Sequence, residues 1–182
     1  PMTGAPDDAA PEIDPAAFVP AFERGQKGEP FSVTAVVQGC TAEEGCTFYA
    51  EGARWIAAAG AGSNEAALAA MAGMAINTPL NIRGDLLFFG DITAEALISD
   101  IELTGPDAYA GYRDAMQGSW VSADDPQSGL QIIGSEQTDT YGAEVMRTSV
   151  MTFSDTCPDG TEVGPAYSTQ EMGGDPADAL CF

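Results

Sequence analysis

The chain has 182 residues, of which 28 are acidic and 6 basic, giving a net charge of −22, and it contains no histidine. This charge excludes nucleic acid as a partner and disfavours anionic membrane surfaces, because no basic stripe exists to neutralise phosphates. The lack of histidine excludes Ser-His-Asp and Cys-His catalysis and histidine metal sites.

The acidity has two interpretations. It can be a solvated, self-repelling surface adapted to salty surroundings, where counterions screen the charge. It can also be a surface complementary to a basic protein. Residues 105–182 hold 13 acidic and 2 basic side chains, so a charge-driven partner should prefer this half of the chain.

Residues 1–30 are rich in proline, alanine and aspartate and are predicted to form a flexible tether with a short helix after Asp14-Pro15. The first eight residues resemble the linker that follows a removed export signal or anchor. We therefore expect a periplasmic or otherwise exported protein, tethered through its N-terminus. No run approaches the roughly 20 apolar residues of a membrane span.

Strand structure is predicted from residue 31, where Phe31, Val33, Ala35 and Val37 alternate with polar or small residues. The run 46–60 is predicted to be its antiparallel partner, with Phe48 and Trp55 in the core. Arg54 beside Trp55 can be a ligand-binding pair or an arginine at a sheet edge.

A helix is predicted over residues 63–76, with Ser63 as its N-cap and Pro79 beyond its end. Residues 80–103 then predict a β-hairpin that turns at Phe89-Gly90-Asp91. A change of parity on the return strand predicts a bulge near Ser99-Asp100. The residues expected to face the core are Leu80, Ile82, Leu86, Phe88, Ala94, Ala96 and Ile98.

Residues 31–104 thus contain two strands, a helix and two strands. A helix before a closing hairpin that contains Gly84 resembles the small oligonucleotide/oligosaccharide-binding (OB) barrel, particularly its exported bacterial variants. That barrel has five strands, whereas four are predicted here. The nucleic-acid role of the family is not expected, because the basic groove residues are absent.

Thr104-Gly105-Pro106-Asp107 marks the predicted boundary to a second section, residues 105–182, which begins with a short helix at 108–116. Gly118-Ser119-Trp120 then resembles the Gly-x-Trp signature of lipocalin-like (calycin) barrels, a resemblance that implies a tryptophan closing one barrel end. Further strands are expected at 130–133, 145–153 and 167–171. Such a barrel has eight strands, so it is incomplete, is completed by the N-terminal half, or continues beyond residue 182.

The four cysteines indicate disulfides in an oxidising compartment. Of three formal pairings we favour Cys40–Cys46, which would staple a hairpin, and Cys157–Cys181, which would close a longer loop. Four free thiols in a cytosolic protein are the alternative. No zinc site is expected, because the chain lacks a CxxC pair.

The sequence predicts a mainly β protein: an antiparallel barrel-like module with one short helix, then a smaller antiparallel β section. We expect no enzyme, cofactor or metal, since Asp124-Asp125-Pro126 is typical of a turn rather than of a catalytic carboxylate pair. The predicted function is an exported binding protein that recognises a basic protein through an acidic β surface. A carrier of small hydrophobic ligands and an accessory subunit of an envelope complex are the alternatives. The candidate ligand-binding residues are Trp120, Tyr141, Trp55 and Arg54.

Overall fold

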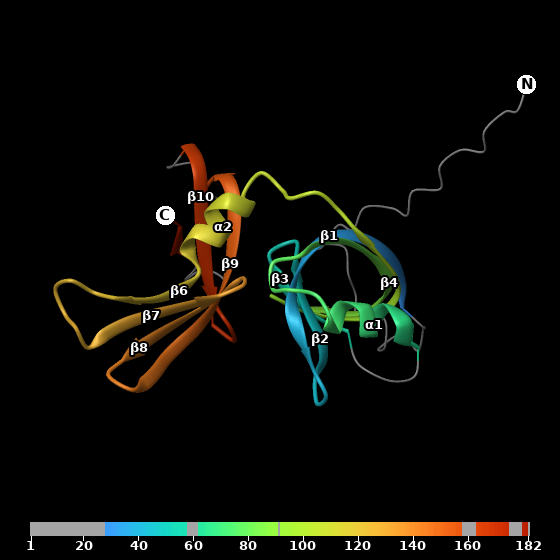
Figure 1. The fold of residues 1–182 in the computed structure, drawn as a ribbon, viewed down its shortest axis with the longest axis horizontal. Coiled ribbons are helices and arrows are strands. Elements are labelled where there is room, and N and C mark those ends of the chain that lie inside the picture. The colour runs from blue at the N-terminus through green and yellow to red at the C-terminus, as the bar shows by residue number, and fades with distance from the viewer. Residues whose placement is uncertain (1–27, 58–61, 91, 158–162, 175–179, 182) are drawn as a thin grey trace, which may run out of the picture.

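The computed structural model describes residues 28–57, 62–90, 92–157, 163–174 and 180–181. The fold is mainly β, as predicted: a closed barrel is followed by a six-stranded antiparallel sheet (Figure 1). The elements are β1 (Glu29–Thr41), β2 (Gly45–Ala50), β3 (Ala53–Ala57), α1 (Glu65–Ala72), β4 (Pro79–Gly90), β5 (Thr93–Leu103), α2 (Ala110–Met116), β6 (Gly118–Val121), β7 (Ser128–Ile133), β8 (Glu136–Tyr141), β9 (Glu144–Thr156), β10 (Val163–Glu171) and β11 (Leu180–Cys181).

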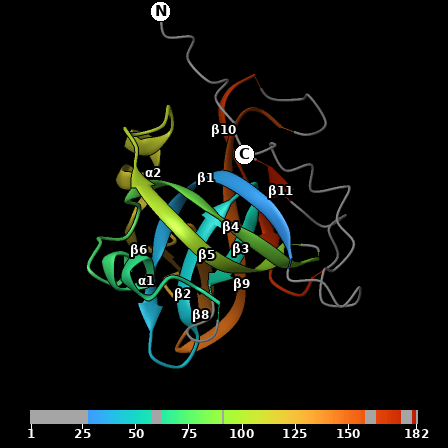
Figure 2. The same cartoon turned by 90° about the vertical axis from the view of Figure 1, so that its right-hand side faces the viewer.

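The barrel closes in the order β1-β2-β3-β5-β4, with β3 and β5 parallel and the other neighbours antiparallel. In Figure 2, β1, β4 and β5 curve across the near side of this barrel. The predicted alternation on β1 is confirmed, because Phe31, Val33, Ala35 and Val37 are all buried. Trp55 is fully buried at the centre of the core, where its ring lies 5.1 Å from Phe31.

The barrel has five strands, so the expectation of four was wrong. The run 46–60, taken as one strand, divides into β2 and β3 at Glu51-Gly52, where both residues have positive φ angles of 52° and 71°. Two consecutive positive φ angles are typical of the tight hairpin turn that matches strand twist. Glutamate is uncommon at such a position, which explains why the sequence did not reveal the turn.

The predicted hairpin of β4 and β5 is confirmed, and so is its bulge. Arg83 lies opposite Asp100 and Gly84 opposite Ile98, which leaves Ser99 as the extra residue. A second irregularity after Leu86 was not predicted. It turns Phe88 away from the core, contrary to expectation, and brings Phe89 against the core in its place.

The helix α1 is shorter than the predicted 63–76, and its N-cap is Asn64 rather than Ser63. The Asn64 side chain accepts hydrogen bonds from the backbone N–H groups of Ala66 and Ala67. The Ser63 hydroxyl is used elsewhere, since it accepts a hydrogen bond from the backbone N–H of Ile98 on β5. Asn64 thus caps the helix and also donates its side-chain amide to the carbonyl of Ser99 on β5, whereas Ser63 contacts the barrel alone.

Both favoured disulfides are confirmed. Cys40 and Cys46 are direct partners in the β1–β2 register, so their bond staples this hairpin. Cys157 is bonded to Cys181 and so ties the end of β9 to β11, 24 residues later. The predicted tether and its helix fall on residues outside the described ranges, except that β1 already begins at Glu29.

Candidate interaction surface on the C-terminal sheet

The turn between β7 and β8 fastens the second sheet to the barrel. The Gln38 side chain on β1 donates to the carbonyl of Ile133 at 2.8 Å and accepts from the backbone N–H of Ser135 at 3.1 Å. Tyr49 on β2 donates its hydroxyl to Glu136 at 2.5 Å. One end of the β6–β8 strands is therefore held at the barrel, and the other end projects away from it (Figure 1).

Arg54 belongs to this junction. Its Nε lies 3.4 Å from Glu136 and a terminal nitrogen lies 3.3 Å from Glu44, so it bridges two carboxylates. Burial, and then the bond to Glu136, raise the pKa of Tyr49 above its ordinary value. The Tyr49 hydroxyl therefore stays protonated as a donor to Glu136. Arg54 therefore helps to hold the second sheet against the barrel.

The structure places Arg54 and Trp55, the pair considered as a ligand site, on opposite faces of β3. Neighbouring residues of a strand point to opposite faces, so Trp55 enters the barrel core while Arg54 faces outward. The Trp55 indole N–H is bonded internally to the carbonyl of Ala50. A fully buried ring with a satisfied N–H offers no surface to a ligand.

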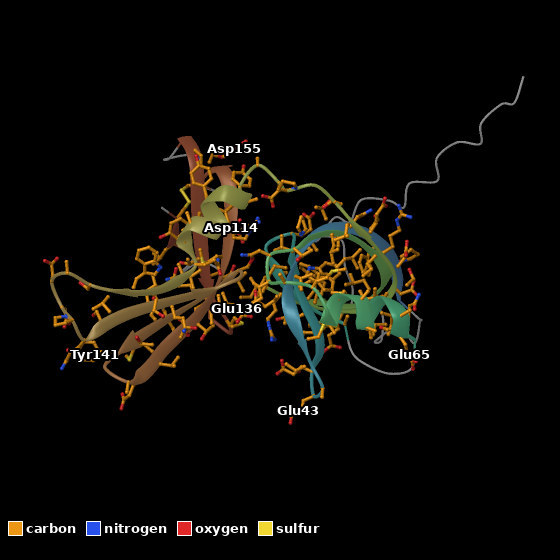
Figure 3. All side chains as sticks on the ribbon, viewed as in Figure 1. Glu43, Glu65, Asp114, Glu136, Tyr141 and Asp155 are labelled. Carbon is orange, nitrogen blue, oxygen red and sulfur yellow. A yellow bond between two sulfur atoms is a disulfide. The ribbon has the colours of Figure 1, made fainter. Side chains whose placement is uncertain are left out.

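Trp120 and Tyr141 share one face of the second sheet. Trp120 lies opposite Leu130, and Ser128, two residues before Leu130, lies opposite Tyr141. Directly paired residues and those two apart along a strand project to the same side. Glu136 has the other parity and faces the barrel, as Figure 3 shows, whereas Tyr141 lies near the far end of these strands.

The second sheet is open, and its tryptophan does not close a barrel as the calycin resemblance implied. Trp120 lies on the outermost strand of the described sheet, β6, and is 51% exposed. Its indole N–H donates to the carbonyl of Met116 at the end of α2, which fixes the ring beside the helix. An apolar depression of about 210 Å³ lies there, lined by Ala115, Met116, Trp120, Leu130 and Ile132.

We call residues 119–130 and 138–147, the two hairpins that project from the barrel, the free end of the sheet. Large apolar side chains are exposed on both of its faces. Beyond Trp120, the exposed fractions are 49% for Tyr141, 66% for Val121, 64% for Val145 and 62% for Met146. Exposed apolar side chains are typical of interaction surfaces where they are contiguous, and Trp120 and Tyr141 share one face of the sheet.

The charge of the free end is negative. It contains four carboxylates and one guanidinium, and this Arg147 is ion-paired with Asp139. Asp124 and Asp125 occupy the β6–β7 turn, where their backbone N–H groups donate to the Ser122 hydroxyl. They form the predicted turn.

The remaining arginine of this section is also paired. Arg113 on α2 donates to Asp107 at 2.7 Å and lies over the Phe153 ring at 5.7 Å from its centre. The Tyr109 ring stacks on Phe153, and its hydroxyl donates to Asp155, a bond that raises the pKa of Tyr109. These contacts attach α2 to the sheet and leave no uncompensated cation among the described residues of the section.

The sequence analysis singled out Trp120 and Tyr141 but not the other three exposed apolar side chains, Val121, Val145 and Met146. Val145 and Met146 were assigned to a regular strand, whereas Met146 is an extra residue at a bulge, because Asp139 pairs with Arg147 and Thr140 with Val145. The run Glu144–Arg147 carries no residue type that marks a bulge. The strand β8, with its polar residues, was also missed.

Comparisons with protein-family models, with curated proteins and with solved structures gave no significant match for the chain. Within the described ranges, no helix combines the length and apolar character that a membrane crossing requires.

Proposed function

We propose that this protein is a non-catalytic, exported binding protein whose acidic C-terminal sheet recognises a basic protein. The observation that supports this most is the composition of the free end. It exposes two aromatic and three aliphatic side chains, and its carboxylates outnumber its one, already paired, guanidinium. Tryptophan and tyrosine commonly contribute most of the energy of protein interfaces.

The two kinds of group would act at different stages of binding. Carboxylates such as Asp124, Asp125 and Glu144 attract a cationic partner and favour its orientation, an effect that salt weakens. The apolar side chains then lose water when the partner covers them, which contributes most of the affinity. Added salt should therefore slow association strongly, whereas it should weaken the affinity less.

An exported location is part of the proposal. Two disulfides persist most readily in an oxidising compartment such as the periplasm. We also propose that the barrel is OB-like, since α1 lies between its third and fourth strands. The likeness of the second sheet to lipocalins is limited to its Gly118-Ser119-Trp120 signature, because its tryptophan does not close a barrel. Neither likeness brings nucleic-acid binding, because the charge opposes it.

A small apolar ligand is the second candidate. The apolar depression beside Trp120 favours it, although this depression is shallow, whereas carriers usually enclose most of their ligand. Such binding would shift the fluorescence of Trp120 in high salt as well as in low salt. Salt sensitivity therefore separates the two candidates.

The test compares three proteins by titration with cationic envelope proteins at low and at moderate salt. In the first variant, Asp124→Asn, Asp125→Asn and Glu144→Gln neutralise the free end. In the matched control, exposed barrel acids are neutralised by Glu43→Gln, Glu95→Gln and Glu102→Gln, which changes the net charge equally. We expect at least tenfold weaker binding for the free-end variant than for the control. Equal weakening would show a response to net charge alone and would contradict the proposed surface.

A further inference from the structure

We infer that β6 is a docking edge, to which the basic partner adds an extended segment as a further β-strand. This inference rests on the proposed function and specifies how the free end would hold its partner. It starts from the position of β6, which forms the outer edge of the described sheet and has all four of its residues exposed.

The register of β6 shows which backbone groups are free to pair. Ser122 donates its N–H to the carbonyl of Ser128, and the same register continues through Trp120 opposite Leu130 to Gly118 opposite Ile132. In an antiparallel ladder, bonded and non-bonded pairs alternate. Ser119 and Val121 therefore direct their N–H and C=O groups away from β7, in the arrangement that an added strand requires.

Apart from its short length of four residues, this edge lacks the features that usually prevent strand addition. Protected edges carry a lysine, a proline or a bulge, or an inward-pointing charge. The sequence Gly-Ser-Trp-Val of β6 contains none of these, and its pairing with β7 is regular. The opposite edge of the described sheet differs, since β11 has only two residues and Cys181 fastens it by a disulfide.

The surroundings of the edge select a cationic strand. The Trp120 ring is fixed beside the edge by its bond to Met116, and such a ring attracts an ammonium or guanidinium group placed over its face. Asp124 and Asp125 lie in the turn that begins after β6, so they flank one end of an added strand. A second copy of this chain is disfavoured as occupant, because it would bring another net charge of −22.

The probe is a synthetic peptide of alternating lysine and valine, six residues long, compared with the same peptide N-methylated at every internal amide. Both peptides carry the same charge, but only the first can form a ladder of hydrogen bonds. We expect the N-methylated peptide to bind at least tenfold more weakly at low salt. Equal binding would overturn strand addition while leaving the proposed function intact. Failure of both peptides and of cationic proteins to bind would overturn the proposed function itself.

Amide hydrogen exchange gives a second, independent readout. Binding of the unmodified peptide should slow exchange at Ser119 and Val121 at least tenfold, with a smaller change at Trp120, whose N–H already faces β7. Unchanged exchange at Ser119 and Val121 in the saturated complex would contradict the inference.

A substitution completes the test. Val121→Pro removes an outward N–H without removing a bond to β7, and Val121→Thr is its control. We expect the proline variant to bind the peptide at least tenfold more weakly than the parent. The urea midpoints of both variants should stay close to that of the parent. A parent protein that sediments as a dimer, and becomes monomeric with Val121→Pro, would show a second copy on this edge and overturn the inference.

Discussion

Tyr49 donates its hydroxyl to Glu136 at 2.5 Å and so joins β2 of the barrel to β8 of the sheet, 87 positions later in the chain. Arg54 contacts the same carboxylate, and Val150 of the sheet belongs to the same buried apolar cluster as Tyr49. A buried phenol, a carboxylate and a guanidinium thus meet where the two parts touch. This contact fixes the direction in which the free end projects.

Tyr49 should make stability depend on pH in the alkaline range. Its pKa is raised in the folded protein, first by burial and then by Glu136, so the folded state holds this proton more tightly than the unfolded state. The contribution is complete below the ordinary pKa of about 10 and is lost as pH rises above it. Urea unfolding between pH 9 and 11 should show a decrease of up to about 1.4 kcal/mol per pH unit from this group.

The control for this prediction is Tyr49→Phe. At neutral pH it loses the hydrogen bond to Glu136, at a cost of about 1 kcal/mol in the free energy of unfolding. Its stability should then decline less steeply above pH 10 than that of the parent. Parallel declines in the two proteins would contradict the assigned role of Tyr49.

Gly84 should not tolerate a side chain. A Cβ at this position would lie 1.9 Å from the carbonyl oxygen of Leu97, which is backbone and cannot move aside without disturbing β5. We expect Gly84→Ala to lower the free energy of unfolding by about 3 kcal/mol, measured by urea unfolding. Gly105→Ala, where a Cβ meets nothing within 4 Å, is the control and should change it by less than about 0.5 kcal/mol. A similar effect at both positions would contradict the close approach of Gly84 to the backbone of Leu97.

The two disulfides should contribute unequally. Cys157 and Cys181 are 24 residues apart and Cys40 and Cys46 are 6 apart, so the first bond restricts the unfolded chain more. The chain-entropy model gives about 3.5 kcal/mol for the longer loop and about 2 kcal/mol for the shorter one. Replacing each pair by serines and measuring urea unfolding without reductant tests this order. The reverse order would show that native contacts, rather than loop length, decide the effect.

Added salt should raise the melting temperature. With 28 acidic and 6 basic residues, the folded chain repels itself, and salt reduces that repulsion. Thermal unfolding followed by circular dichroism between low and roughly 0.5 M sodium chloride measures the effect. The variant with Asp124, Asp125 and Glu144 neutralised should gain less than the parent. A melting temperature that stays constant or falls would refute the prediction.

The sequence was sufficient where local chemistry decides the structure. Alternation predicted the inward face of β1. The turn signal at Phe89-Gly90-Asp91 indicated the closing hairpin, although Phe89 and Gly90 belong to β4. The polar turn between Cys40 and Cys46 favoured the pairing of the four cysteines that the structure shows. The bulge at Ser99 was predicted because the alternation of apolar residues along β5 changes parity there.

Features that depend on backbone geometry or on distant contacts could not be predicted from the sequence. Nothing in the sequence indicates a positive φ at Glu51, so the turn that creates the fifth barrel strand was not predicted. Ser63 and Asn64 are both good N-caps, and the choice between them depends on the contacts that both make with β5. Tyr49 and Glu136 come together only after both parts have folded, which no local pattern records.

The most direct test of the account uses the two indole N–H signals in a proton–nitrogen NMR spectrum, since the chain has two tryptophans. Trp120 lies half-exposed at the proposed surface, whereas Trp55 is fully buried in the barrel and serves as an internal control. Titration with a cationic protein at low salt should shift the Trp120 signal and leave the Trp55 signal in place. A saturable complex that shifts the Trp55 signal alone, or neither signal, would contradict binding at the free end of the sheet.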